Sequence, residues 1–263
     1  MTQKLLRMAV LATALALAAC GGSSDPSTDA EAPAPGTILD SAAQAAEETG
    51  AAAAIPQPDP DKPLSSYPEL TSGQQVMFMY VAASRMPPDF EQLASTFSRE
   101  YRQSNDAFRK NDLMQAIKPQ LEQGIAQAAD HPYAWVEVDD ASLGSYDFER
   151  GGFTVGEFTR DHYRYFNDVN PYEATRFGYT WANRDQFAFA PVADEAVARK
   201  LESMRTQRRD KPRLKVYFFA QSADLNQDRV HALVTRVQIT DRNGNVLFEY
   251  GPDTSAANAA GQP

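Results

Sequence analysis

Cysteine is almost absent from this sequence of 263 residues, which contains one cysteine, Cys20, and only three histidines. A single cysteine excludes an internal disulfide, and the chain after residue 20 has no thiol for nucleophilic or redox chemistry. The histidines His131, His162 and His231 are far apart and form no H-E-x-x-H pair. We therefore expect no metal site and no cofactor. His131 should cap or lie in a loop, and His231 should face solvent or pair across strands.

Catalytic motifs are also missing. The sequence has no G-x-S-x-G, no S-x-x-K and no glycine-rich phosphate loop. The adjacent carboxylates Asp139 and Asp140 would point to opposite faces of a strand, so we expect them to mark the end of a strand rather than an acid–base pair. Residues 224–228 begin like a calcium loop, but Arg229 and Thr235 stand where the EF-hand needs glycine and glutamate. We expect a polar turn there, and no catalytic residue can be assigned.

Positive charge is scarce, and the formal net charge of the chain is −10 at pH 7. Residues 1–19 contribute +2 and residues 20–65 contribute −7, which leaves −5 for the rest of the chain. Sequence-independent binding of nucleic acid depends on Lys and Arg that neutralise phosphates. We therefore expect no nucleic-acid partner.

The first 20 residues have the pattern of a targeting segment. Lys4 and Arg7 precede an uncharged run that, at about a dozen residues, is too short to span the ~30 Å hydrocarbon core of a membrane. The run ends in a motif that resembles the lipobox of bacterial lipoproteins, Leu17-Ala18-Ala19-Cys20. The resemblance implies that residues 1–19 are a signal peptide that is removed and that Cys20 is lipidated. The alternative is a buried apolar helix that happens to end in cysteine.

The resemblance to lipoproteins also implies a location. In that family an aspartate directly after the cysteine retains the protein in the inner membrane, and here this position is Gly21. Two or three acyl chains together hold a protein firmly on a bilayer. We therefore expect the chain to be anchored through Cys20 to membrane lipid, in a Gram-negative cell the outer membrane, with its domain in the periplasm.

The composition divides the remaining chain into a linker, a domain and a tail. Residues 20–65 are rich in Ala, Pro, Gly and acidic side chains, which cannot bury enough apolar surface to fold, apart from a short helix around residues 38–48. The stretch from Ile55 to Pro63 should be extended. Residues 66–251 should form one domain, and residues 252–263 a tail without structure.

Helices are expected in the first half of the domain. Apolar side chains recur at helical spacing between Ser72 and Arg85, and again along one stripe from Phe90 to Tyr101. A third helix should begin near Asn105 or Asp106, and Pro119 should kink or split it.

Strands dominate the second half. We expect strands over Tyr133–Val138, as a short pair within Tyr146–Val155, and over Gln186–Val192, Leu214–Ala220, Arg229–Thr240 and Val246–Tyr250, with one helix from Asp194 to Met204. Within 229–240 the residues Val230, Ala232 and Val234 should face a core and, past a slip in register, so should Val237 and Ile239. Asn243-Gly244 predicts a tight hairpin with positive φ at both turn positions. The fold class should be α+β, with N-terminal helices packed on a largely antiparallel C-terminal sheet.

A second resemblance concerns the domain itself. The segment Leu143-Gly144-Ser145-Tyr146-Asp147-Phe148, the following Gly151-Gly152-Phe153 and the closing strands up to Glu249 look like an uncharacterised family of bacterial secreted or lipid-anchored proteins. The resemblance would cover residues 67–251. It implies no activity, because that family has no assigned function.

Residues 158–181 interleave aromatic side chains with arginines. The candidate interaction residues are Arg160, His162, Tyr163, Arg164, Arg176, Tyr179 and Trp181. Such a mixture suits carbohydrate stacking or a protein hot spot, because both use flat rings and planar guanidinium donors. The alternative is a loop-rich region whose aromatic side chains fill the core beneath it.

Taken together, these patterns favour a membrane-anchored envelope lipoprotein that acts as a binding or assembly module. The expected partners, besides membrane lipid, are an envelope protein or cell-wall glycan. The alternative is a cell-wall or polysaccharide hydrolase whose carboxylates the sequence does not identify.

Overall fold

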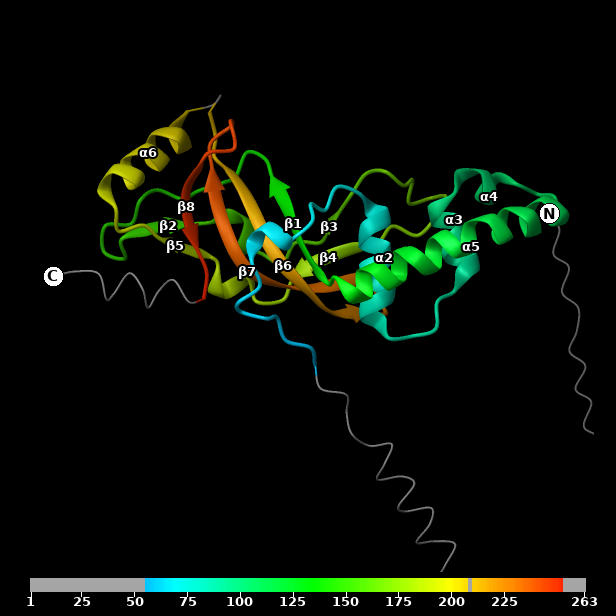
Figure 1. Cartoon of the computed structure of the whole chain (residues 1–263). Helices are drawn as coiled ribbons and strands as arrows, with labels where there is room; N and C mark the ends of the chain where they lie inside the picture. The colour runs from blue at the N-terminus through cyan, green and yellow to red at the C-terminus, as the bar shows by residue number, and fades with distance from the viewer. Residues whose placement is uncertain (1–54, 208–209, 253–263) are drawn as a thin grey trace, which may run out of the picture. The chain divides into compact units, whose positions relative to one another are not determined.

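The computed structural model describes residues 55–207 and 210–252, which form an α+β unit (Figure 1). The signal segment, Cys20, the expected helix around residues 38–48 and the tail after Pro252 lie outside the described residues. The α+β class is confirmed, since helices pack on a mixed, mostly antiparallel six-stranded sheet.

The helices of the first half follow the sequence pattern closely. They are α2 (Gly73–Ser84), α3 (Phe90–Phe97), α4 (Arg99–Gln103) and α5 (Ala107–Asp130), preceded by the 3-10 turn η1 (Leu64–Ser66). The start of α2 is fixed by a capping box, in which the Ser72 side chain accepts from the Gln75 N–H and the Gln75 side chain accepts from the Ser72 N–H.

One of these helices differs from the prediction, and for another only one of two predicted alternatives is excluded. The stripe from Phe90 to Tyr101 is broken, because Ser98 takes an extended conformation and its hydroxyl caps the next helix by accepting from the Tyr101 N–H. Pro119 does not split α5, which runs without interruption through it. The carbonyl that loses its partner to Pro119 belongs to Gln115, an exposed residue that water can reach.

The sheet has the strand order β1-β6-β7-β4-β3, and β8 also pairs with β7. Its strands are β1 (Tyr133–Val138), β3 (Arg164–Tyr165), β4 (Gly178–Trp181), β6 (Arg213–Asp224), β7 (Arg229–Thr240) and β8 (Val246–Tyr250). All pairs are antiparallel except β4 with β7.

A separate two-stranded ribbon joins β2 (Gly152–Thr154) to β5 (Phe189–Pro191). The pair of strands expected within Tyr146–Val155 is therefore reduced to β2, with a single bridge between Asp147 and Gly152. The strand expected from Gln186 is also shorter, because residues 184–186 form the 3-10 turn η3 (Arg184–Gln186). The helix expected after it is confirmed as α6 (Glu195–Thr206).

The two faces of the sheet bury different side chains. Residues that alternate along β6 and β7 on one face belong to the main core, including Val216, Phe218, Val230 and Ala232. We call this the main-core face, and α2 and α6 contribute residues to the same core. The opposite face, here called the aromatic face, carries a smaller cluster of Tyr67, Tyr133, Trp135, Tyr217, Phe219 and Leu233.

A bulge in β7 keeps both faces in phase. Phe218 pairs with Val234 but Tyr217 pairs with Arg236, so Thr235 is one extra residue on β7. Val234 and Val237 therefore both reach the main core, with exposures of 2% and 0%. The slip in register that the alternation predicted is confirmed.

The β7–β8 hairpin is present, but its turn is not the predicted one. Gly244 has φ +81°, while Asn243 is not among the described residues with positive φ. The carboxylate of Asp241 organises the turn by accepting from the N–H groups of Asn243 and Asn245, both at 2.9 Å. The Asp241 side chain thus stabilises this turn without a second residue of positive φ.

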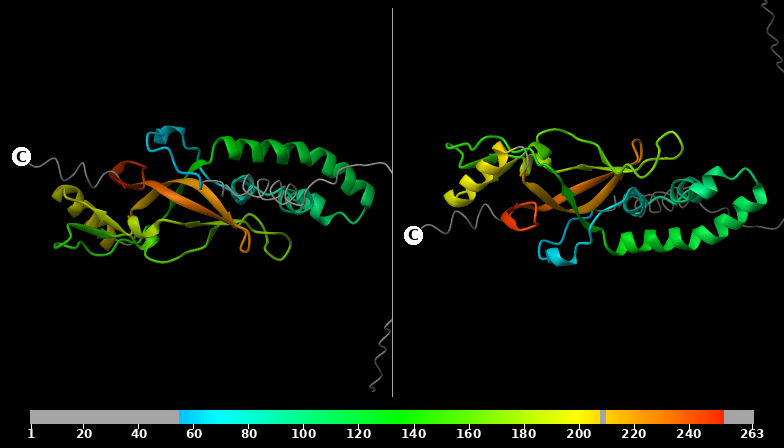
Figure 2. Two further views of the ribbon diagram at one scale, coloured as in Figure 1. Left: turned by 90° about the horizontal axis from the view of Figure 1, so that it is seen from below. Right: turned by 90° about the horizontal axis from the view of Figure 1, so that it is seen from above.

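The domain also begins earlier than expected. Residues 55–65, which the composition assigned to the linker, lie against the aromatic face, where the Asp59 N–H donates to the Tyr133 hydroxyl oxygen at 2.7 Å. The Gln221 side chain donates to the Pro56 carbonyl at 3.1 Å. We call residues 55–63 the strap. Seen from above and below, α6 lies at one end of the sheet beside β2 and β5, and α2 to α5 lie at the other end (Figure 2).

Candidate functional site

The short strands β3 and β4 place the residues of the arginine-rich segment on two different faces. Arg164 pairs with Tyr179, and Tyr165 pairs with Gly178, which in turn pairs with Arg229 of β7. Paired residues point to the same side of a sheet. Tyr165 and Arg229 therefore lie on the aromatic face, whereas Arg164 and Tyr179 point to the main-core face.

Four side chains form a stack at this edge of the sheet. The Arg176 guanidinium lies 3.8 Å from the centroid of the Tyr165 ring, and the Arg229 guanidinium lies 4.8 Å from that of Tyr163. The two ring centroids are 5.3 Å apart. We call Arg176, Tyr165, Tyr163 and Arg229 the arginine–tyrosine ladder. Tyr163 and Tyr165 are 36% and 41% exposed, so the ladder is part of the surface.

Two local features hold the ladder in place. The Tyr163 hydroxyl donates to the Arg176 carbonyl at 2.8 Å. The Tyr163 ring also lies directly on Gly178, where an added Cβ would come within 2.2 Å of a ring carbon. Only glycine therefore allows the ring this close to the backbone of β4.

The arginines of the ladder are stacked rather than neutralised. Among residues 55–207 and 210–252, no carboxylate forms an ion pair with Arg176 or Arg229, and the buried Nε of Arg229 has no hydrogen-bond partner. Arg176 donates to the Asn167 side chain at 3.2 Å. Burial raises the pKa of Tyr163, although both guanidinium groups oppose that rise. The ladder thus presents two positive charges beside two tyrosine rings.

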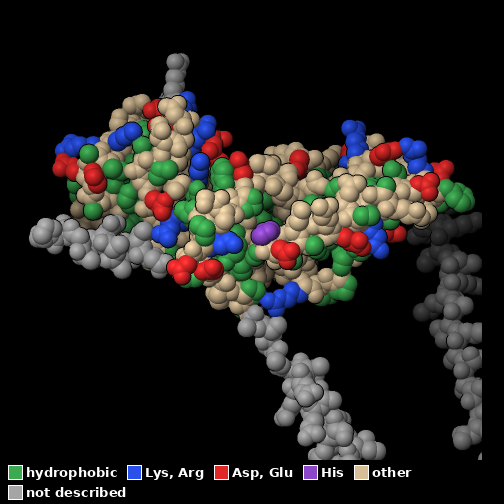
Figure 3. All heavy atoms as spheres, in the orientation of Figure 1, with side chains coloured by type: hydrophobic (Ala, Val, Ile, Leu, Met, Phe, Trp, Pro, Cys, Tyr) green, Lys and Arg blue, Asp and Glu red, His purple; other side chains and the backbone are tan. Residues whose placement is uncertain are grey.

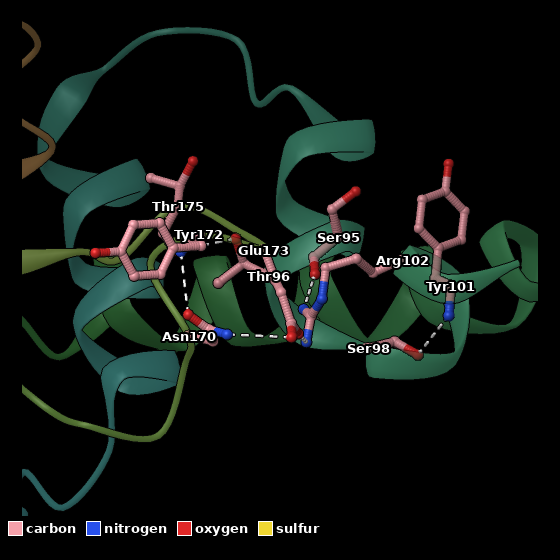
Figure 4. Close-up of polar contacts among 9 residues, drawn as sticks. All are labelled: Ser95, Thr96, Ser98, Tyr101, Arg102, Asn170, Tyr172, Glu173 and Thr175. Atoms are coloured by element: carbon pink, nitrogen blue, oxygen red, sulfur yellow. Dashed lines mark hydrogen bonds and ion pairs between the residues drawn. The ribbon is translucent and has the colours of Figure 1, made fainter.

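The loop between β3 and β4 is fastened to the helices. Arg102 of α4 forms an ion pair with Glu173 at 3.4 Å, and the Thr96 hydroxyl of α3 donates to the Thr175 carbonyl at 3.3 Å (Figure 4). Both contacts follow the tip of the loop, and before the tip the Asp168 carboxylate accepts from the Gly73 N–H of α2 at 2.7 Å. The loop is therefore docked on the helices on both sides of its tip.

The tip of that loop presents a tyrosine. Asn170 accepts from the Tyr172 N–H and donates to Glu173, both at 3.1 Å, which closes a turn (Figure 4). The Tyr172 side chain is 96% exposed. A large exposed ring on a held turn costs little ordering entropy when it binds a partner.

Beneath the ladder lies a buried carboxylate. Glu157, in the 3-10 turn η2 (Gly156–Phe158), is 6% exposed and is the one acidic residue buried in the described part of the chain. One of its oxygens accepts from Trp181 Nε1 at 2.8 Å and the other is ion-paired with Arg164. Both oxygens are engaged, so Glu157 supports the structure and is not available as a catalytic acid.

The seven predicted surface residues therefore separate into groups. Tyr163 and Arg176 belong to the ladder, and Arg160 and His162 precede it along the chain, with Arg160 exposed and His162 half-buried. Arg164 is held by Glu157, and Tyr179 and Trp181 are core residues with exposures of 5% and 4%. These last two support the surface from below rather than forming it.

The candidate set omitted three residues. Tyr165 and Tyr172 lie in the same segment, and their aromatic character was the available signal. Arg229 comes from β7, and nothing local in the sequence shows that β4 pairs with β7 in parallel.

The other polar candidates have structural places. His131 caps the C-terminus of α5, and the Nδ1 of His231 lies 3.4 Å from the Ser222 hydroxyl on the neighbouring strand. Asp139 and Asp140 follow the last residue of β1, and residues 224–228 are the last residue of β6 and the turn that connects it to β7. Within the described ranges, no three His, Cys, Asp or Glu side chains are arranged to hold a metal ion. No helix in those ranges is long and apolar enough to cross a membrane.

Comparison with known proteins gives no relative: no family model, no curated protein and no solved structure matches this chain. The lipobox and the resemblance to an uncharacterised family therefore stay predictions from the sequence.

Proposed function

We propose that this chain is a lipid-anchored lipoprotein of the bacterial cell envelope that acts as a binding module, and that the arginine–tyrosine ladder is its contact with a protein partner. The lipobox ending at Cys20 supports the anchor. The ladder supports the binding role, because it combines exposed aromatic side chains with guanidinium groups that have no carboxylate partner in the described residues.

The geometry of the ladder favours a protein over a sugar. A sugar ring binds an aromatic residue by lying on its face, but a guanidinium already lies over each of Tyr163 and Tyr165. The groups left for a partner are ring edges, the Tyr172 ring and guanidinium donors. Tyrosine and arginine anchors of this kind are enriched at the centres of protein interfaces.

The hydrolase alternative has no comparable support. An acid–base mechanism needs a carboxylate in a cavity with a second one in reach. Glu157 is the buried acid of the described chain, and Arg164 and Trp181 occupy both of its oxygens.

The test is cross-linking and affinity capture of the full-length lipidated protein from its own envelope. The variant Arg176→Ala with Arg229→Ala should reduce the amount of captured partner by more than about tenfold, since hot-spot residues contribute about 2 kcal/mol or more. Arg199→Ala is the matched control, because Arg199 is an exposed arginine on α6. The thermal unfolding midpoints of all variants show whether they are folded.

Capture that is unchanged in the folded double variant would remove the ladder from the interface. Recovery of glycan fragments without any protein would contradict the protein-binding proposal itself.

A further inference from the structure

A cavity of about 280 Å³ lies on the aromatic face, well away from the ladder along β7. Its walls come from four separate parts of the chain: the strap and the residues that follow it, the region of η3, the bulged part of β7, and Pro252 after β8. The polar side chains around it include Asp59, Lys62, Tyr67, Asn183, Gln186 and Arg236. Ligand sites of proteins begin at about 300 Å³, so a cavity of this size suits one small molecule.

The walls of the cavity are fixed mainly through backbone groups, although Asp59 Oδ1 also accepts from the Asp61 N–H at 2.9 Å. The strap is held through the backbone of Asp59, which donates to Tyr133, and through the backbone of Pro56, which accepts from Gln221. On the opposite side, the Tyr67 hydroxyl lies 3.2 Å from the Thr235 hydroxyl. The cavity is therefore preformed, which lowers the entropic cost of binding.

Charges of both signs face the cavity without neutralising one another. In the described chain, Asp59 forms no ion pair with Lys62 or Arg236. The Lys62 ammonium lies 5.2 Å from the Tyr133 ring centroid, and the Arg236 guanidinium is 3.7 Å from Glu249. Burial raises the pKa of Tyr67. Arg236 lowers this pKa and Asp59 raises it, so both charges lie close enough to act on the same hydroxyl group.

We propose that this cavity binds a small zwitterion, a free amino acid or a dipeptide. Asp59 accepts hydrogen bonds from the ammonium group of the ligand. Lys62 and Arg236 donate to its carboxylate, and the side chain of Gln186 is available for an amide group. A separated pair of opposite charges is complementary to the two ends of such a molecule, whereas a neutral sugar or a simple anion would leave one charge without a partner.

This inference goes beyond the proposed function and does not depend on the ladder. The cavity proposal and the ladder proposal can be rejected independently. They concern different residues, and the ladder is tested by capture of a protein rather than by binding of a small molecule.

The experiment is calorimetric titration of the full chain with alanyl-alanine and with two blocked forms, the N-acetyl dipeptide and the dipeptide amide. We expect saturable binding of the free dipeptide and at least about tenfold weaker binding of each blocked form, because each loses one charged contact. Asp59→Asn should weaken binding of the free dipeptide but not of the N-acetyl form. Arg236→Ala should weaken binding of the free dipeptide but not of the amide.

Glu195→Gln and Arg199→Ala are the matched controls, since they remove an exposed carboxylate and an exposed guanidinium on α6. Both should leave the affinity unchanged. If Arg236→Ala lowers the thermal unfolding midpoint, Lys62→Ala replaces it as the variant that removes a positive charge from the cavity. The proposal is overturned if the free dipeptide shows no saturable binding at millimolar concentration, if the blocked forms bind equally well, or if the folded cavity variants bind like the controls.

Discussion

The side-chain amide of Asn183 pairs with the backbone of Val234 as a neighbouring strand would. The Val234 N–H donates to Asn183 Oδ1 at 2.8 Å, and Asn183 Nδ2 donates to the Val234 carbonyl at 2.9 Å. On this side of β7, pairing with β4 ends at Ala232 and pairing with β8 begins at Val237. Asn183 thus occupies the space between two strands and satisfies a backbone segment that neither of them reaches.

Replacing this amide should destabilise the fold. Asn183→Ala leaves a buried N–H and a buried C=O of Val234 without partners, and we expect a loss of about 2 kcal/mol or more in the free energy of unfolding. Urea denaturation measures the loss. Asn226→Ala, in the exposed turn between β6 and β7, is the control and should change stability by less than about 0.5 kcal/mol. Equal stability of the two variants would contradict the structural role of Asn183.

The buried carboxylate beneath the ladder gives a second prediction. Glu157→Gln keeps an acceptor for Trp181 but removes the charge that faces Arg164. Breaking a fully buried pair costs about 3–5 kcal/mol, and because the Arg164 side chain is 32% exposed we expect a smaller loss of about 1–3 kcal/mol. Glu195→Gln breaks the exposed pair with Arg199 and should cost at most about 0.5 kcal/mol. Similar losses for both variants in urea denaturation would contradict the assignment.

The buried tyrosines predict how the protein responds to alkali. Burial raises the pKa of Tyr179 and of Tyr250 well above the ordinary value of about 10. In the folded state each phenol stays neutral at pH values at which it would already be ionised in the unfolded chain. Its contribution to stability is therefore complete below about pH 10 and is lost as the pH rises above that value toward the folded-state pKa.

An alkaline titration checks this. Phenolate absorbance should appear partly in a late, cooperative step that coincides with loss of circular dichroism. Tyr179→Phe should remove one tyrosine from the late step and move the alkaline unfolding midpoint to higher pH. Absorbance that rises in one gradual step, before any unfolding, would show that these phenols are accessible.

The anchor is testable without structural information, since Cys20 lies outside the described residues. The chain has no other cysteine, so Cys20→Ala should abolish incorporation of a fatty-acid analogue and release the protein from the membrane fraction. Labelling of the unsubstituted chain in the same cells is the positive control. Continued labelling of the variant would disprove lipidation at this residue.

Local patterns predicted the elements of this fold better than their arrangement. The helices and the strands β6, β7 and β8 were predictable because apolar side chains recur in them every 3.6 or every 2 residues. Such a pattern involves only residues that are close together in the sequence. The break at Ser98 was missed because the apolar stripe continues across it, and the serine acts through its own hydroxyl. The turn at Asp241 was misread for a similar reason, since one carboxylate replaced the backbone conformation that Asn-Gly favours.

The candidate site was predicted in part. Its arginine and tyrosine composition was visible in residues 158–181, but the sequence did not show which of these side chains share a face. That division is set by the register of β3 with β4 and of β4 with β7. The same parallel pairing brings Arg229 to Tyr163, a contact between residues that no local pattern connects.

The bulge at Thr235 allows β7 to hold one residue more than regular alternation permits. With Thr235 in place, Val237 and Ile239 are both 0% exposed in the main core, on the same side as Val234. Straightening the strand with Thr235 still present would turn Arg236 and Gln238 inward, whereas removing Thr235 would leave a regular strand in which Val237 and Ile239 still face the core. Thr235 is therefore a position of β7 at which a residue can be lost without moving the residues beyond it to the opposite face of the sheet.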